Sequence, residues 1–533
     1  MNDKHARWLA LYVLCLGDLM IVLDTNIVNV ALPSIQADLG FSQTALAWVV
    51  NAYMLTFGGF LLLSGRLGDL FGNKRVFLGG VVSFTAASIA CGLASSPLLL
   101  VLGRAVQGLG GAAVSAVALA LITGLFTEPA ERAKAMGFFG FVMSGGGAVG
   151  VLAGGVLTGL LNWHWIFLVN VPIGVGVWVA ARRVLPADQV RVGGQRLDVP
   201  GAGLVTLSLM IAVYAVVGGN EAGWASSETL GLLAAAAALM VAFVVREARV
   251  EHPLVPLRLF KLRNVTISQV IGVLWAGAMF AWFFLSALYL QQVLGYGALE
   301  VGLAYLPACV VMAICSLRVS DRLVMRVGIR TPLAAGLGLV AASLALFAFA
   351  PVGGSYVVNV LPAMILLGLG AGIAFNPVLL AAMGDVEPHE AGLASGVVNT
   401  SFMMGGALGL AVLAAVSSWW TGTQPDPSSL ESLNGGFQVA FAVGAVFAAA
   451  AAVIGGALLR PKPMAMPDLE VGDEVPVPST ESNGVVRGVK TMSLGPTFEI
   501  HGLAHTEVSD SGPGCGRPLS TAGPAPGSLS SSW

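Results

Sequence analysis

Three ionisable residues lie inside long apolar stretches of this sequence: Asp18, Asp24 and Arg104. A charged side chain in hydrocarbon costs at least about 2.5 to 3.5 kcal/mol on insertion scales, so each such residue needs a partner and suggests a function. Asp24 lies about six residues before the end of its stretch, and Arg104 lies about six residues after the start of another. If the two stretches run in opposite directions through a bilayer, both side chains lie about 9 Å deep, and the carboxylate and the guanidinium could meet.

Two interpretations of this pair remain open at the level of sequence. Arg104 could help to set the protonation of Asp24, so that opening of the site to either side binds or releases a proton. The two residues could instead form a permanent pair that only holds helices together.

Asp18 also has two interpretations. It could line the inner half of a wide cavity, where a carboxylate suits a cationic substrate or a proton, or it could be a solvated or helix-bonded acid. Further polar side chains are candidates for the cavity wall, and each of them could instead bond a neighbouring helix; they are Asn26, Gln107, Gln291, Gln292, Asn376 and Asn399.

The composition indicates that lipid, rather than water, surrounds most of the chain. Of its 533 residues 56% are hydrophobic and 10% are charged, against roughly a quarter charged in an ordinary globular protein. Long apolar runs between short charged loops predict one body embedded in a membrane. The first run follows Lys4 and Arg7, extends to about Leu32 and lacks a convincing cleavage site, so we interpret it as a membrane helix rather than a signal peptide.

The apolar runs predict fourteen membrane helices, at about 20 residues per crossing. We expect them at residues 10–32, 46–64, 77–95, 98–125, 136–160, 165–184, 200–218, 229–246, 266–290, 302–318, 331–350, 357–382, 393–417 and 437–459. An even number of crossings puts both ends of the chain on the same side.

The positions of Lys and Arg predict which side this is. These residues fall before the first helix and in every second loop, and the remaining ones are Arg104 inside a helix and Arg487, Lys490 and Arg517 near the C-terminus. Because positively charged loops stay in the cytoplasm, we expect both termini to be cytoplasmic. The predicted outer loops contain no Lys or Arg.

An internal repeat predicts how the helices are grouped. GRLGDLFGNKR, Gly65 to Arg75, follows the second predicted helix, and DRLVMRVGIR, Asp321 to Arg330, follows the tenth. A parallel repeat of six helices would place the second copy after the eighth helix, so two extra helices must separate the halves. We therefore expect an all-α integral membrane fold, with six-helix bundles at 1–199 and 251–460, an inserted helix pair at 200–250, and a disordered cytoplasmic tail at 461–533, which is rich in Pro, Ser and Gly.

The first copy of the repeat has residue types that suit a tight turn between helices. Gly65, Gly68 and Gly72 would permit the turn and a close helix approach, and Asp69 could pair with Arg75 or cap a neighbouring helix. A plainer reading is a charged loop that only sets topology. The stretch resembles the signature of the major facilitator superfamily, which uses it as a cytoplasmic latch between its halves, and the resemblance assigns this role to Gly65, Arg66, Gly68, Asp69, Gly72, Lys74 and Arg75.

Four further stretches are similar to the fourteen-helix drug/proton antiporter branch of that superfamily. They are LDTNIVNVALP at 23–33, NWHWIFLVNVPIG at 162–174, YLQQVLGYGALEVGLAYLP at 289–307 and GLASGVVNTSFMMGGALG at 392–409. The resemblance covers nearly all of residues 8–460. It implies two six-helix bundles related by a pseudo-two-fold axis, two inserted helices, and exchange of a drug or antibiotic for protons by alternating access.

The fifth predicted helix departs from the exporter pattern GxxxGPxxGG at one position. Gly146, Gly150, Gly154 and Gly155 match the pattern, but Val151 stands where the proline is expected. The glycines would still permit close helix packing. The missing proline removes an expected kink.

An ion gradient is the energy source that the sequence favours. No Lys follows a Gly, so the P-loop motif for ATP is absent. One proton crossing about 150 mV supplies roughly 3.5 kcal/mol, which is equivalent to about a 300-fold concentration ratio. We expect no cofactor and no metal, and we interpret the HxxxH spacing of His501 and His505 as chance.

The leading hypothesis is proton-coupled export of amphipathic small molecules, such as drugs or antibiotics, through the cell membrane. Its expected partners are this substrate, protons and the lipid bilayer, with no nucleic acid, and a monomer is plausible. The nearest rival is a proton-coupled metabolite symporter. A membrane enzyme would need a catalytic pair, but His164 and His389 are isolated; a receptor or scaffold that transports nothing would not need buried Asp24 and Arg104.

Overall fold

The computed structural model describes residues 3–42, 44–186, 198–250, 253–255, 257–383 and 391–460. In these ranges the regular elements are all helical. The chain divides into the units Met1–Met464 and Ala465–Trp533, and the described helices belong to the first. The predicted tail at 461–533 lies outside the described residues.

The helices follow the predicted order. The first group is α1 (Asp3–Leu39), α2 (Trp48–Phe71), α3 (Asn73–Gly92), α4 (Pro97–Leu125), α5 (Pro129–Leu160), the short α6 (Trp165–Leu168) and α7 (Asn170–Val184). The next pair is α8 (Val199–Ala222) and α9 (Ser227–Glu247). The last group is α10 (Arg263–Leu288), α11 (Ala298–Ile314), α12 (Ser320–Val327), α13 (Arg330–Ala348), α14 (Leu361–Met383), α15 (Ala391–Gly422) and α16 (Leu430–Leu458). Short 3-10 or π turns complete the series at η1 (Ala45–Ala47), η2 (Leu257–Lys261), η3 (Tyr289–Val293), η4 (Cys315–Val319) and η5 (Tyr356–Val360).

Thirteen helices in the described part of the chain are long and apolar enough to cross a membrane. One of them, Trp165–Val184, combines α6 and α7. The remaining predicted crossing, at 136–160, falls in α5, which has 32 residues and contains a shorter apolar stretch at Val149–Leu160. The chain is therefore a multi-pass membrane protein with a helix count close to the expected fourteen.

Residues at the helix starts explain several of these boundaries. Ser96 accepts a hydrogen bond from the backbone N–H of Leu99 and caps α4, which begins with Pro97. A hydroxyl cap satisfies a backbone donor that the first turn leaves free. Proline suits the first helical position because its missing N–H is not needed there. The helix α5 also begins with a proline, Pro129, but without a side-chain cap.

The turn between α2 and α3 is shorter than the glycine spacing predicted. The helix α2 continues through Gly65 and Gly68 to Phe71, and the direction changes at Gly72 alone, with a φ of 98°. Only glycine adopts such a φ without strain. Gly328, with a φ of 77°, occupies the same place between α12 and α13, so the internal repeat preserves the residue that makes the turn.

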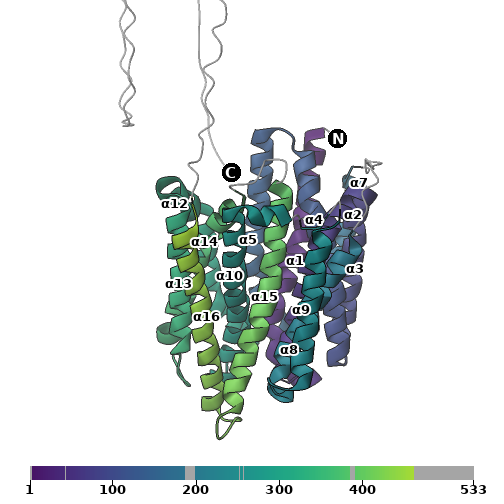
Figure 1. The fold of residues 1–533 in the computed structure, drawn as a ribbon. Helices are drawn as coiled ribbons and strands as arrows, with labels where there is room; N and C mark the ends of the chain where they lie inside the picture. The colour runs from purple at the N-terminus through teal and green to yellow at the C-terminus, as the bar shows by residue number, and fades with distance from the viewer. Residues whose placement is uncertain are drawn as a thin grey trace, which may run out of the picture. The chain divides into compact units, whose positions relative to one another are not determined.

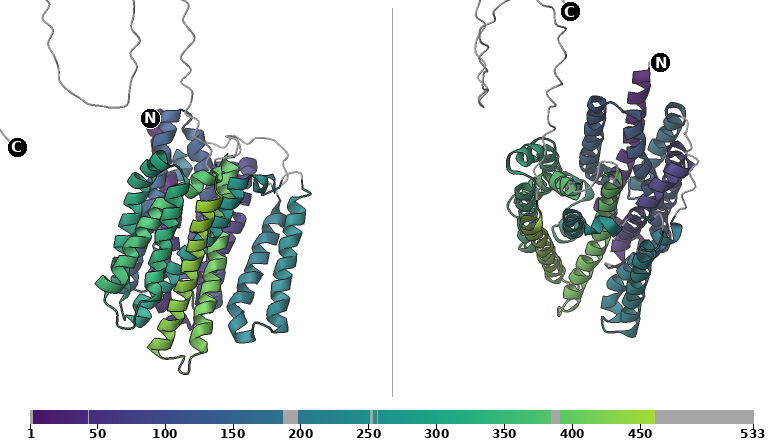
Figure 2. Two further views of the ribbon diagram at one scale, coloured as in Figure 1. Left: turned by 60° about the vertical axis from the view of Figure 1, so that its left-hand side comes forward. Right: turned by 45° about the horizontal axis from the view of Figure 1, so that its top comes forward.

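The packing joins the two groups of helices along two seams. Within the first group α4 packs against α2 and α3, and α5 packs against α1; α5 then contacts α11, and α2 contacts α15. The helices α8 and α9 form a hairpin beside the others, and α8 touches both α2 and α15 (Figure 2). In Figure 1 α1 begins and α16 ends at the same end of this unit, as an even number of crossings requires. We name it the inner end after the predicted cytoplasmic location of the termini, and we name the opposite one the outer end.

Candidate functional site

Asp24 and Arg104 form an ion pair between α1 and α4. The Asp24 side chain is 0% exposed and the Arg104 side chain is 1% exposed. The two charges therefore meet at one depth, as their positions in the sequence predicted. Their shared burial makes each the main compensation for the charge of the other.

The carboxylate of Asp24 accepts two further hydrogen bonds. Nε2 of Gln107 donates to its Oδ1 over 2.7 Å, and Nδ2 of Asn170 donates to the same oxygen over 2.9 Å. Gln107 lies one turn after Arg104 on α4, whereas Asn170 begins α7. Sequence reasoning missed Asn170, although it is a buried amide within an otherwise apolar run.

The guanidinium of Arg104 has partners of its own. Its Nε donates to the carbonyl of Val49 on α2 over 2.9 Å, and its Nη1 donates to Oε1 of Gln107 over 2.7 Å. The ring of Tyr53 lies 4.3 Å from the guanidinium carbon, a distance at which an aromatic face attracts a cation. These three contacts and the ion pair with Asp24 fix the position of the cation.

The network extends to α3 through Ser88. Nε2 of Gln107 donates to the hydroxyl oxygen of Ser88 over 2.9 Å, and Ser88 donates to the carbonyl of Phe84. Gln107 therefore touches both members of the ion pair and a third helix. The charge state of Asp24 is thus linked by direct contacts to the positions of α1, α4 and α7, because each contributes a hydrogen-bonded side chain.

Asp18 lies apart from this network. Its Oδ1 accepts a hydrogen bond of 2.6 Å from the hydroxyl of Ser115 on α4, and its Oδ2 has no hydrogen-bond partner among the described residues. The side chain is 0% exposed. In this conformation Asp18 is a helix-bonded acid that does not face open space.

The glutamine pair of η3 connects the two groups of helices. Nε2 of Gln291 donates to the carbonyl of Val30 over 2.9 Å, and Nε2 of Gln292 donates to Oε1 of Gln36 over 2.9 Å. Val30 and Gln36 belong to the last turns of α1. These contacts join α1 to the start of the α10–α11 connection at the outer end.

The other predicted polar residues lie elsewhere. Nδ2 of Asn26 donates to the carbonyl of Val22 on its own helix over 2.7 Å. Nδ2 of Asn376 donates to the carbonyl of Ser316 over 3.1 Å, and Asn399 is exposed on α15. The structure therefore brings Gln107 to Asp24 and Arg104, and it leaves Asn376 and Asn399 in the second group of helices.

Lys74 anchors the predicted latch within the first group. Nζ of Lys74 donates to the carbonyl of Leu185, at the end of α7, over 2.5 Å. Gly68 lies against Asn73 and Val117, so a Cβ at this position would have no room. The side chain of Asp69 lies outside the described part of the structure.

The glycines of α5 permit two different helix contacts. A Cβ on Gly150 would lie 2.9 Å from the carbonyl oxygen of Leu23, and one on Gly154 would lie 2.7 Å from that of Ile27, both on α1. A Cβ on Gly155 would lie 2.8 Å from the carbonyl oxygen of Ala298 on α11. Gly146 also faces α1, through Leu19 and Val22. The helix runs unbroken through Val151.

We predict that Gly154→Val lowers the stability of the folded chain, because the new side chain would overlap the backbone of Ile27. Overpacking of this kind costs about 1 to 3 kcal/mol. The midpoint of thermal unfolding in detergent would measure this loss of stability. Gly140→Val is the matched control, since it lies on the same helix and its Cβ would meet nothing within 4 Å; equal midpoints for the two variants would contradict the prediction.

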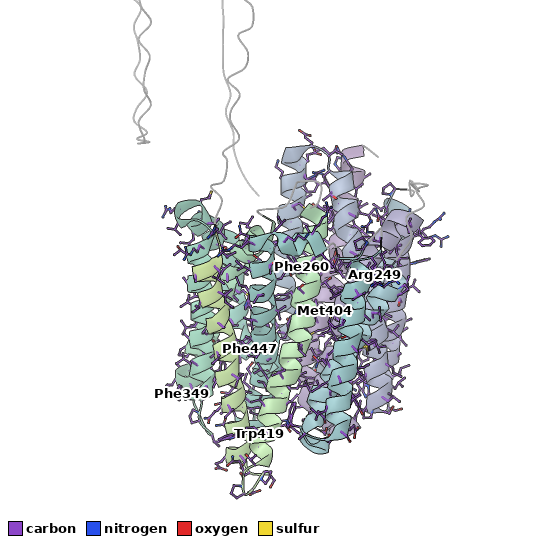
Figure 3. The ribbon with its side chains drawn as sticks, in the orientation of Figure 1. Arg249, Phe260, Phe349, Met404, Trp419 and Phe447 are labelled. Atoms are coloured by element: carbon purple, nitrogen blue, oxygen red, sulfur yellow. The ribbon has the colours of Figure 1, made fainter. Side chains whose placement is uncertain are left out.

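A cavity of about 500 Å³ lies between α8 and α15. Figure 3 places one of its residues, Trp419, at the outer end. The predicted site residues do not line it, and its walls are apolar: Val216, Trp224, Val412, Ala415, Val416 and Trp419. No group of three or more His, Cys, Asp or Glu side chains that could hold a metal occurs among the described residues, and His501 and His505 lie outside them.

Comparisons with known proteins agree along most of the chain. The family model described as Major Facilitator Superfamily matches residues 14–410. The puromycin resistance protein pur8 of Streptomyces alboniger is 41% identical over 82% of this chain and 89% of its own length. The cephamycin export protein CmcT of Amycolatopsis lactamdurans is 41% identical over 81% of this chain and 89% of its own.

A more distant relative and a solved structure extend the comparison. The lincomycin resistance protein of Streptomyces lincolnensis is 34% identical over 84% of this chain and 92% of its own length. The crystal structure of the nucleoside transporter NupG has a TM-score of 0.60 and 13% identity, and it covers 85% of this chain and 100% of the NupG chain. At that identity the likeness concerns the fold alone.

Proposed function

This chain belongs to the Major Facilitator Superfamily, and we propose that it exports amphipathic small molecules, such as antibiotics, through the cell membrane in exchange for protons. The names of the similar proteins support the substrate class, since they include puromycin resistance, cephamycin export and lincomycin resistance. The buried Asp24–Arg104 pair supports the proton coupling. The proposal involves no catalysed reaction and no cofactor.

The single observation that carries the coupling is the arrangement around Asp24. Its carboxylate bonds to Arg104, Gln107 and Asn170, which belong to two other helices. A proton on Asp24 would remove the charge that attracts Arg104, and the contacts of α4 and α7 with α1 would weaken together. A helix arrangement that exposes Asp24 to one side of the membrane would then load or release the proton there.

The proposed domain organisation follows the predicted one. Six-helix bundles at 1–199 and 251–460 would rock about the seams that α5 makes with α11 and α2 makes with α15. The inserted pair at 200–250 would lie beside the second seam. Both termini would be cytoplasmic, and a monomer would be sufficient for transport.

We propose that the hydrogen bonds of Gln291 and Gln292 to α1 hold the outer end closed. Replacing both with alanine would remove about 2 kcal/mol if each bond contributes about 1 kcal/mol, which shifts the closed-to-open equilibrium about 30-fold. Labelling of a cysteine at Leu299 by an impermeant thiol reagent would report the opening, because Leu299 packs against Gly159 there. Gln424→Ala, in an outer loop, is the control; unchanged labelling in the double variant would refute the assignment.

Flux measurements in inside-out vesicles would test the proposal as a whole. With an imposed pH gradient, uptake of puromycin, a cephamycin or lincomycin opposite to the proton movement is the expected result. Uptake in the same direction as protons would favour the rival symporter. Transport that does not depend on the gradient would exclude both the proton antiporter and the proton symporter. Binding without any flux would favour a receptor.

A further inference from the structure

A second cluster of buried charges lies at the inner end of the inserted helices, separate from Asp24. Asp198 immediately precedes α8, and Arg246 and Glu247 end α9. The chain then passes through a connection to α10. Figure 3 labels two residues of this connection, Arg249 and Phe260, at the inner end of the structure.

One carboxylate oxygen of Asp198 is fully engaged. Its Oδ1 accepts a hydrogen bond of 2.9 Å from the backbone N–H of Gly201, which caps α8, and one of 2.6 Å from Nε of Arg246. The Asp198 side chain is 1% exposed, and that of Arg246 is 36% exposed. Arg246 therefore compensates one buried negative charge.

One carboxylate oxygen of Glu247 ties α9 to the connection. Its Oε2 accepts a hydrogen bond of 2.9 Å from the backbone N–H of Val255. Glu247 as a whole is 3% exposed. A second buried carboxylate thus lies beside the first, and the ion pair of Arg246 is with Asp198.

The two remaining oxygens lie against the same side of Gly201. Oδ2 of Asp198 and Oε1 of Glu247 are buried, and neither has a hydrogen-bond partner among the described residues. A Cβ built on Gly201 would lie 2.5 Å from the former and 3.0 Å from the latter. Two ionised carboxylates are both acceptors and repel each other, so a buried pair placed this closely favours a proton on one of them.

We propose that Asp198 and Glu247 bind one proton between them and that this proton clamps the connection to α10 onto the inserted helices. With the shared proton, the pair and Arg246 are neutral as a group. Without it, an uncompensated negative charge stays buried, which is costly. Asp198 and Arg246 are the charged groups that act on Glu247 among the described residues; Arg66 on α2 and Arg258 on the connection also take part in interactions.

The clamp reaches the seam between the two groups of helices. Next to Val255, Leu254 is buried against Leu63 of α2 and Ala202 of α8. The helix α2 is also the one that packs against α15. Release of the shared proton would leave two negatively charged carboxylates beside each other. Their repulsion would weaken the attachment of the connection to α2. The proposed site therefore makes the docking of the inserted pair depend on the pH at the inner end.

Thermal unfolding of the full chain in lipid nanodiscs tests the proposal. Because the folded pair holds a proton that an exposed glutamate has already released, the midpoint of the native chain should fall by about 3 °C more than that of Glu247→Gln when the pH rises from about 6 to about 9. The glutamine can accept from the N–H of Val255 and donate to Oδ2 of Asp198, so it copies the protonated glutamate. Parallel pH profiles for the two chains would overturn the proposal.

Infrared spectroscopy supplies a second, direct measurement. The native chain at neutral pH should show a protonated carboxyl band that Glu247→Gln lacks. Glu228→Gln is the matched control, since Glu228 is exposed in the first turn of the same helix, and it should retain the band. A band that is unchanged in Glu247→Gln would also overturn the proposal. Neither measurement involves transport, so the result is independent of the export proposal.

Discussion

Asp24→Asn is expected to reduce proton-driven drug uptake to the level of vesicles without the protein. Asparagine keeps the size of the side chain and still accepts hydrogen bonds from Gln107 and Asn170, but it cannot release a proton. If Asp24 carries the coupling, the gradient-driven accumulation of the drug should be lost, and that accumulation is at most about 300-fold for one proton across about 150 mV. Uptake into inside-out vesicles at an imposed pH gradient measures it.

Asp426→Asn is the control for this variant. Asp426 is exposed in the loop between α15 and α16, and hydrogen bonds from the side chain and backbone of Ser428 hold its pKa below the usual range. It therefore stays ionised and takes no part in proton exchange. Full coupled uptake by Asp24→Asn would instead show that the Asp24–Arg104 pair only holds helices together.

Arg104→Met should have the largest effect on stability. It leaves the buried carboxylate of Asp24 without its cation and frees the carbonyl of Val49. Removing one partner of a buried pair costs about 3 to 5 kcal/mol, so the midpoint of unfolding should fall steeply and much of the chain should be lost during expression. The double variant with Asp24→Asn should recover most of the loss, because no buried charge then lacks a partner.

Arg182→Gln gives the comparison for the loss of an arginine alone. Arg182 is exposed at the end of α7 and lies over the ring of Trp178, so its removal should change the midpoint little. If the double variant is no more stable than Arg104→Met, the main task of Arg104 is not to compensate Asp24. Its contact with the ring of Tyr53 would then become the leading explanation.

The sequence identified the charged pair because depth in a membrane can be read from position along a helix. The two helices run in opposite directions, and 1.5 Å of rise per residue puts Asp24 and Arg104 at one level; the structure confirms their contact. Gln107 was predicted only as a polar candidate for the cavity wall; it reaches both members of the pair because it lies one turn from Arg104. Asn170 was missed because nothing in one sequence says that the start of α7 packs against the middle of α1.

Other positions required the fold. The sequence left Asp18 with two interpretations, and only the packing of α4 against α1 provides the hydroxyl of Ser115 that it bonds. The glycine spacing of the first repeat predicted a longer turn than the single residue Gly72 makes. Local spacing indicates where a chain can bend, but the contacts of the flanking helices decide where it does.

The charged residues inside apolar stretches show most clearly what the sequence determines and what only the tertiary structure decides. Hydrophobic length and the alternation of Lys and Arg determine the membrane helices and their predicted direction, because the bilayer imposes both rules on every segment separately. The sequence of one segment does not determine which side chains meet, since partners such as Asp24 and Asn170 are 146 residues apart. Only the tertiary packing brings them together, and it also creates the carboxyl pair of Asp198 and Glu247, which no local pattern predicts.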